Sequence, residues 1–161
     1  MATANKNLSN YDKSTLPKAV DFKIGMVVSE WNIEITKDLV KGASETLLSC
    51  GVKKSNIFVE YVPGSFELVF AAKKAQSKDL DAIIAIGCII QGQTKHFDFV
   101  CQGVTQGIKD LNVLYNTPVI FCVLTDETLQ QSIDRSGGKY GNKGTEAAVT
   151  AVKMAALSKT Q

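Results

Sequence analysis

Residues 82–90 read AIIAIGCII, and this run decides the fold class because it is almost entirely apolar and rich in β-branched isoleucine. Continuous apolar runs of this length are typical of strands buried on both faces of a parallel sheet. Shorter runs of the same kind lie at residues 24–28, 57–62 and 119–124. Segments with helical spacing separate them, so the sequence predicts a three-layer α/β/α sandwich with a four-stranded parallel sheet.

Apolar residues recur at the three- and four-residue spacing of a helix in five segments. These segments run from residue 35 to 50, from about 65 onward, from 94 to 111, from 129 to 135 and from about 145 to 157. Thr94 is placed to cap the third of them. Residues 1–22 are polar and lack a clear period. We therefore expect a mobile or docked N-terminal tail over residues 1–22, followed by a single domain over residues 23–161.

Composition excludes several classes of protein. The chain has 161 residues, of which 45% are hydrophobic and 21% are charged, and this is the profile of a folded domain. A net charge of +2 without a basic cluster argues against a nucleic-acid or membrane-surface partner. No apolar run approaches the ~18 residues that span a bilayer, and the polar residues 1–18 do not form a secretory signal. These features predict a cytoplasmic protein.

The cysteines and the histidine narrow the chemistry further. Cys50, Cys88, Cys101 and Cys122 show no C-x-x-C spacing and lie in or beside apolar stretches, which favours buried free thiols. The single histidine, His96, excludes a His-rich zinc site, and we expect no metal. A lone histidine is more often structural than catalytic, so a catalytic role for His96 needs support from its surroundings.

Residues suited to ligand binding follow each predicted strand. Open parallel sheets bind ligands beyond the carboxyl ends of their strands. The segments at those ends are residues 29–32 with the only tryptophan, residues 63–67, residues 91–96 with the histidine, and residues 125–127. Aromatic side chains, a carboxylate, a glycine turn and the histidine are therefore expected to converge on one edge of the sheet.

Two stretches are candidate anion sites. Residues 92–94 stand between a buried strand and a helix start, where backbone N–H groups and the helix dipole attract anions, although a routine glycine turn explains them equally well. His96 would follow in the first turn of that helix, where a neutral imidazole can accept a proton near pH 7. Arg135 precedes a loop, residues 136–144, with four glycines and two lysines. That loop lacks the Walker A spacing, and a plain connection between helices is the alternative.

Four blocks of the sequence resemble the lumazine synthase family in order and spacing. They are VPGSFE at residues 62–67, GCIIQGQTKHFD at 87–98, PVIFCVLT at 118–125 and RSGGKYGNKG at 135–144. The likeness extends from about residue 23 to residue 157. It implies flavodoxin-like layering and an N-terminal segment able to add to a neighbouring subunit's sheet. The family joins 5-amino-6-(D-ribitylamino)uracil to 3,4-dihydroxy-2-butanone 4-phosphate, forming 6,7-dimethyl-8-ribityllumazine for riboflavin synthesis, without a metal or organic cofactor.

The resemblance also implies roles for individual residues. By motif, Trp31 is similar to the aromatic residue that stacks on the pyrimidine, and His96 to the histidine that transfers protons. The implied pyrimidine-binding residues are Trp31, Ser65, Phe66, Glu67, Cys88, Ile89, Ile90, Phe121 and Lys143. The implied phosphate-binding residues are Gln93, Thr94 and Arg135, with Arg135 pairing the phosphate as a guanidinium fork. Of these residues, Phe121, Arg135 and Lys143 resemble those that a neighbouring subunit contributes.

Members of this family are pentamers with active sites between subunits, and many build a 60-subunit icosahedral shell. The short loop between Gly138 and Gly144 favours the shell here, and riboflavin synthase is a further partner that the resemblance allows. Two alternatives stay open. An FMN-binding module expects a Ser/Thr-rich loop where residues 29–32 read SEWN. A catalytically inactive flavin-binding or shell-forming paralogue is harder to exclude, although Glu67, His96 and Arg135 argue against it.

Overall fold

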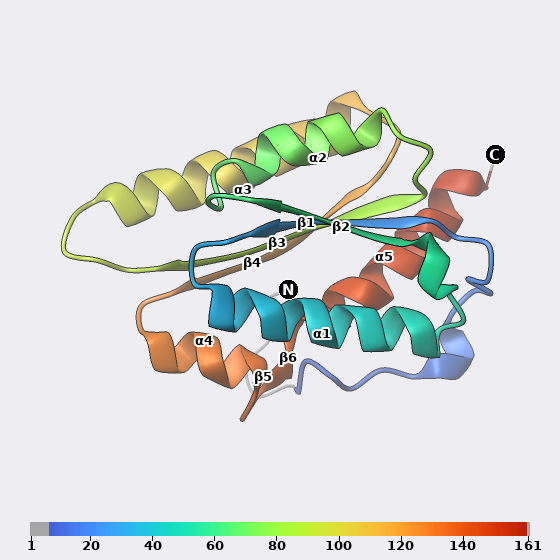
Figure 1. Cartoon of the computed structure of the whole chain (residues 1–161), viewed down its shortest axis with the longest axis horizontal. Helices are drawn as coiled ribbons and strands as arrows, with labels where there is room; N and C mark the ends of the chain where they lie inside the picture. The colour runs from blue at the N-terminus through green and yellow to red at the C-terminus, as the bar shows by residue number, and fades with distance from the viewer. Residues whose placement is uncertain (1–6, 161) are drawn as a thin grey trace.

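The computed structural model describes residues 7–160, and its centre is a parallel sheet with the strand order β2–β1–β3–β4. The strands are β1 (Ile24–Ser29), β2 (Ile57–Val62), β3 (Ala82–Ile90) and β4 (Val119–Asp126). Helices α2 (Leu68–Gln76) and α3 (His96–Leu114) cover one face, and α1 (Ile33–Ser49), α4 (Leu129–Arg135) and α5 (Lys143–Lys159) cover the other (Figure 1). The predicted three-layer α/β/α sandwich is therefore confirmed.

The central strand β3 supplies side chains to both halves of the core, because successive residues of a strand point to opposite faces. Ile83 and Ala85 pack towards α2 and α3, together with Leu68 and Val104. The alternate residues of β3 pack on the other side with α1 and α5 in a cluster that includes Ile84, Ile86, Cys88, Leu39 and Val152. Burial on both faces explains why β3 gives the strongest apolar signal in the sequence.

Small residues let α1 and α5 approach each other closely. Thr46 and Thr145 face each other with their hydroxyl oxygens 3.2 Å apart, and a side chain at Gly42 would collide with Asn142. The amide nitrogen of Asn142 donates to the carbonyls of Asp38 at 2.8 Å and Ser136 at 3.0 Å. Asn142 also caps α5, because its side-chain oxygen accepts from the backbone N–H of Gly144 at 2.8 Å. One residue thus fixes the start of α5 against α1.

The structure differs from the sequence-based expectation at three helix starts. The second helix begins at Leu68 instead of near Ser65, so Glu67 precedes it. The N-cap position of α3 is Lys95, which makes no side-chain cap hydrogen bond. The Thr94 hydroxyl, one residue earlier, accepts from the N–H of His96 at 3.3 Å. Residues 136–144 are not a plain loop. They form a two-stranded hairpin, β5 (Ser136–Gly138) and β6 (Gly141–Asn142), and the first turn of α5.

The described part of the predicted tail, residues 7–22, packs on the rest of the chain. Ala19 and Phe22 belong to the core beside α1 and α5, and the N–H of Leu8 donates to the carbonyl of Tyr140 at 2.8 Å. Among the described residues, single turns of 3₁₀ helix occur at Lys13–Thr15 and at Lys54–Asn56. Residues 1–6 of the predicted tail lie outside the described residues, and the boundary at residue 22 stays a prediction. Across residues 7–160, no helix combines the length and apolar character needed to cross a bilayer.

Candidate active site

The strand order creates a switch point at the carboxyl ends of β1 and β3. The chain passes from β1 to β2 on one side and returns to place β3 on the other side of β1. Ligands of open α/β sheets bind at such a point. A cleft of about 640 Å³ opens there. It is lined by Trp31, Asn32, Gly64, Ser65, Phe66, Glu67, Cys88, Ile89, Ile90, His96, Phe99 and Val100.

Backbone hydrogen bonds hold Trp31 at the rim of this cleft. The N–H of Glu30 donates to the carbonyl of Val62 at 2.8 Å, and that of Trp31 donates to Pro63 at 3.1 Å. The indole is 73% exposed, so its face is open to a ligand. Asn32 follows in the left-handed region with φ 57°, which asparagine tolerates better than most residues. Its amide donates to the carbonyl of Cys88 at 2.9 Å, which ties the start of α1 to the end of β3.

The segment after β2 places a carboxylate and an aromatic ring beside Trp31. A Cβ added at Gly64 would lie 2.8 Å from Glu67 Oε2 and 3.7 Å from the Trp31 ring, so both side chains lie close to the backbone of Gly64. Phe66 is 58% exposed, and its ring lies against Gly103 of α3. The hydroxyl of Ser65 is buried and has no hydrogen-bond partner within residues 7–160. Such a hydroxyl has unused capacity to bond a ligand.

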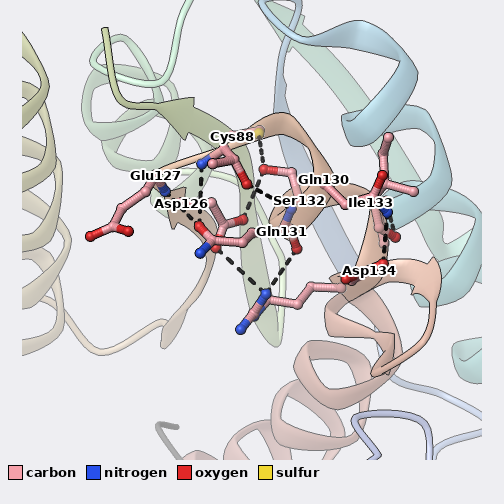
Figure 2. Close-up of polar contacts among 11 residues, drawn as sticks. Cys88, Asp126, Glu127, Gln130, Gln131, Ser132, Ile133 and Asp134 are labelled. Carbon is pink, nitrogen blue, oxygen red and sulfur yellow. Dashed lines mark hydrogen bonds and ion pairs between the residues drawn. The ribbon is translucent and has the colours of Figure 1, made fainter. Parts of the chain in front are cut away.

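The end of β3 forms the floor of the cleft through Cys88, Ile89 and Ile90. Burial raises the pKa of the Cys88 thiol to about 11, so this sulfur is neutral at physiological pH and is no nucleophile. The thiol lies 3.4 Å from the hydroxyl of Ser132 on α4 and donates to it (Figure 2). The predicted convergence holds for the segments after β1, β2 and β3, whereas residues 125–127 at the end of β4 do not line the cleft.

His96 is exposed and lines the cleft as the first residue of α3. Gln93 and Thr94 lie just before it in the exposed connection from β3 and are not among the residues that line the cleft. His96 is the first residue of α3 and also lines the cleft. The start of this long helix therefore lies at the same edge of the sheet as the cleft. Within residues 7–160, no group of three or more His, Cys, Asp or Glu side chains is arranged to hold a metal ion.

Phe121, Arg135 and Lys143 do not line the cleft of their own chain. Phe121 is in the middle of β4 and packs against the core beneath α2 and α3. Lys143 begins α5, where its ammonium group donates to the Glu146 carboxylate at 2.6 Å. Burial alone would lower the pKa of Lys143, but the hydrogen bonds and neighbouring charges, those of Glu146 among them, together outweigh burial and raise this pKa. Arg135 ends α4 and donates from Nη1 to the carbonyl of Gln131 at 2.9 Å.

Comparison with known proteins identifies the family. The family model for 6,7-dimethyl-8-ribityllumazine synthase matches residues 21–159. The chain belongs to the 6,7-dimethyl-8-ribityllumazine synthase family. The resemblance carried by the four sequence blocks is thereby confirmed.

Three relatives with that name show how close the similarity is. The protein of Flavobacterium johnsoniae is 65% identical over 156 residues, which covers 96% of this chain and 82% of the relative. That of Flavobacterium psychrophilum is 62% identical over 158 residues, covering 98% and 84%. That of Christiangramia forsetii is 62% identical over 161 residues, covering 99% and 96%.

The sequence did not point to every residue that shapes this lumazine synthase cleft. Asn32 was part of a candidate segment, and its tolerance of positive φ is a signal that could have marked it as the link to Cys88. Asp126 was part of the candidate segment 125–127, but nothing in the sequence marked Ser132 as its partner. Their hydroxyl and carboxylate meet at 2.8 Å only because α4 folds back over the end of β4.

Proposed function

We propose that this lumazine synthase family member condenses 5-amino-6-(D-ribitylamino)uracil with 3,4-dihydroxy-2-butanone 4-phosphate, a transferase reaction that yields 6,7-dimethyl-8-ribityllumazine, phosphate and water. One observation carries the proposal: the switch-point cleft collects an exposed indole, a carboxylate, a strand end and the only imidazole of the chain. A flat heterocycle with hydrogen-bonding edges fits that combination, because the indole offers a stacking surface and the strand end offers backbone polar groups.

The pyrimidine substrate is proposed to lie between Trp31 and the end of β3. Trp31 stacks on the ring, while the backbone of Cys88, Ile89 and Ile90 bonds its edge. Ser65, Phe66 and Glu67 hold the ring and its ribityl chain, and the partnerless buried hydroxyl of Ser65 supports this assignment. Phe121 and Lys143 are proposed to complete the pocket from a neighbouring subunit, since neither lines the cleft of its own chain.

The phosphate group of the second substrate is proposed to bind at the start of α3. A helix N-terminus presents free backbone N–H groups and the positive end of its dipole to an anion. Gln93 and Thr94 precede this start by a few residues and supply polar groups there. Arg135 of a neighbouring subunit is proposed to pair the phosphate through its guanidinium, whose planar donors match phosphate oxygens.

The chemistry needs no protein nucleophile, because one substrate carries an amine and the other a ketone. The amine attacks the carbonyl and water leaves as the imine forms. Elimination of phosphate leaves an enol that tautomerises to a second ketone. The ribityl-bearing nitrogen attacks this ketone, and loss of a second water closes the second ring. Holding the two substrates together can supply ~7–11 kcal/mol of the barrier reduction in favourable cases. His96 moves protons between these steps, which typically contributes a factor of ~10²–10⁴.

The assembly is proposed to be a homo-pentamer, with a 60-subunit icosahedral shell as its higher form. Support comes from large apolar side chains that a single chain leaves exposed on α2 and α3, among them Phe70 at 73% and Val113 at 73%. The open edge of β2 also exposes Phe58 and Tyr61, and a neighbour's N-terminal segment is proposed to pair there. Sedimentation distinguishes the forms: a five-chain particle rejects the shell, and a monomer rejects the shared site. A cytoplasmic location and riboflavin synthase as a partner stay predictions.

Mixing the purified protein with both substrates tests the function directly. We expect lumazine absorbance to appear together with one phosphate per product. Omitting either substrate is the control, and neither signal should then appear. If the protein binds riboflavin at the cleft but forms no product from the two substrates, it is an inactive flavin-binding paralogue and the proposed function is wrong.

A further inference from the structure

A chain of polar contacts runs from the floor of the cleft to Arg135. The Cys88 thiol donates to the Ser132 hydroxyl at 3.4 Å, and that hydroxyl donates to Asp126 Oδ2 at 2.8 Å. The other carboxylate oxygen, Asp126 Oδ1, lies 4.0 Å from Arg135 Nη1. Figure 2 shows Cys88, Ser132 and Asp126 following one another in this order. Three separate elements, β3, β4 and α4, therefore meet in a single contact path.

The first three members of this chain are shielded from water. Cys88 is 2% exposed, Ser132 is 0% exposed and Asp126 is 8% exposed. The hydroxyl of Ser132 accepts a hydrogen bond from the thiol and donates one to the carboxylate. The Ser132 hydroxyl hydrogen therefore points at Asp126. The thiol stays protonated at physiological pH, because burial raises the pKa of Cys88 to about 11. The carboxylate of Asp126 is consequently held in a fixed orientation.

Arg135 is held on one side only. Its Nη1 donates to the Gln131 carbonyl at 2.9 Å and faces Asp126 Oδ1, and its guanidinium carbon lies 5.1 Å from the centre of the Tyr140 ring. The side chain is 36% exposed, so part of the guanidinium stays accessible to an anion. A guanidinium has five N–H donors, and the contacts to Gln131 and Asp126 use the Nη1 side. The remaining donors are therefore available in a defined direction.

The contact between Asp126 and Arg135 is poorly explained by stability alone. An ion pair at 4.0 Å with a partly exposed arginine contributes little to folding. A flexible arginine, by contrast, loses rotamer freedom when it captures a ligand, and prior ordering removes that cost. The buried carboxylate beside Arg135 is therefore better explained by ordering the arginine for ligand binding than by stabilising the fold.

We propose that Asp126 is a positioning residue that, fixed by Ser132 and Cys88, orients Arg135 to receive the phosphate group of the phosphate-bearing substrate. This inference rests on the proposed function, because it takes Arg135 as a phosphate ligand. The carboxylate does not touch the substrate. It acts through the guanidinium, whose charge and free donors make the contact with the phosphate oxygens.

The test compares Asp126→Asn, Ser132→Ala and the matched control Glu127→Gln. The control removes one negative charge from the exposed neighbouring position and leaves the contact path intact. Steady-state assays give kcat and the KM of each substrate, and inorganic phosphate serves as a competitive inhibitor. We expect Asp126→Asn to raise the KM of the phosphate-bearing substrate and the Ki of phosphate about 3- to 10-fold, the loss that follows from ordering one long side chain at binding. Ser132→Ala should shift both in the same direction by a smaller factor.

The split between substrates separates positioning from general damage. The KM of the pyrimidine substrate should stay unchanged in both variants, and Glu127→Gln should match the wild type throughout. Thermal unfolding and sedimentation check that each variant folds and assembles. Ser132→Ala keeps the buried charge and so carries the test if Asp126→Asn does not assemble.

The opposite result is as informative. If Asp126 only competes with phosphate for Arg135, Asp126→Asn will lower the KM of the phosphate-bearing substrate, and the positioning role is wrong. Equal KM and Ki values in wild type, Asp126→Asn and Ser132→Ala also overturn it. An inactive wild type is a different failure: it refutes the proposed function, and the positioning role falls with it.

Discussion

His96 lies where the cleft meets the first turn of α3, within reach of a substrate but away from the buried core. If its role is proton transfer, His96→Ala should lower kcat by about 10²- to 10⁴-fold and leave a measurable rate, because substrate proximity is retained. Steady-state kinetics with both substrates saturating measures the effect, and equilibrium binding of the pyrimidine substrate is the control. An unchanged kcat with both substrates bound would show that His96 is structural.

Cys122 on β4 gives a second prediction at the residue scale. It is completely buried, and burial raises its pKa to about 12, against about 8.5 for an unfolded thiol. Below pH ~8.5 the thiol is protonated in both the folded and the unfolded chain, so it adds no pH dependence to the free energy of unfolding. Above it the unfolded chain loses the proton first, so the free energy of unfolding should fall by up to ~1.4 kcal/mol per pH unit until about pH 12.

Urea unfolding of the wild type and Cys122→Ala at pH 7, 9 and 10 isolates this contribution. The wild type should lose stability more steeply than the variant, because lysine and tyrosine titration is common to both. Cys50→Ala is the matched control, since Cys50 is only partly buried and should change the slope less. Parallel pH profiles for wild type and Cys122→Ala would contradict the assignment.

At the scale of elements, the strands were predictable and several helix starts were not. The run from Ala82 to Ile90 is buried on both faces, so its apolar pattern alone defines β3. The start of α5 depends instead on a hydrogen bond between distant segments. Asn142 caps α5 and also donates a hydrogen bond to the carbonyl of Asp38 in α1. No local pattern in residues 136–144 predicts the contact with Asp38. For the same reason the sequence predicted the cleft residues after β1, β2 and β3 but not the link from Cys88 to Asp126.

Helix α4, in contrast, begins with a purely local contact, because Thr128 and Gln131 form a capping box. The Thr128 hydroxyl accepts from the N–H of Gln131 at 3.3 Å, and the Gln131 side chain accepts from the N–H of Thr128 at 3.2 Å. Thr128→Ala should lower the free energy of unfolding by about 1 kcal/mol. Thr128→Ser keeps the acceptor and should cost much less. Urea denaturation of the three proteins measures this, and equal losses in both variants would show that the cap contributes nothing.

At the scale of the whole molecule, a single chain does not bring the cleft and Arg135 together. The cleft gathers Trp31, Glu67 and His96 at the carboxyl edge of the sheet, whereas Arg135 is the last residue of α4, a helix beside α1 and the hairpin (Figure 1). Large apolar residues exposed on α2 and α3 are typical of a surface that a protein partner covers. Both observations favour an assembly in which one subunit's arginine serves a neighbour's cleft.

Mixed assemblies of His96→Ala and Arg135→Ala chains test this sharing. The Arg135→Ala chain keeps His96, and the His96→Ala chain keeps Arg135. If the two residues of one site come from different chains, a site that combines these two intact residues is equivalent to a wild-type site. Random mixing in equal amounts, after unfolding and refolding together, should therefore restore about a quarter of the sites in a closed ring. Activity at a low concentration of the phosphate-bearing substrate measures the recovery, and each variant refolded alone is the control. If both residues came from the same chain, no mixed assembly could regain an intact site, and activity would stay at the mean of the two single variants.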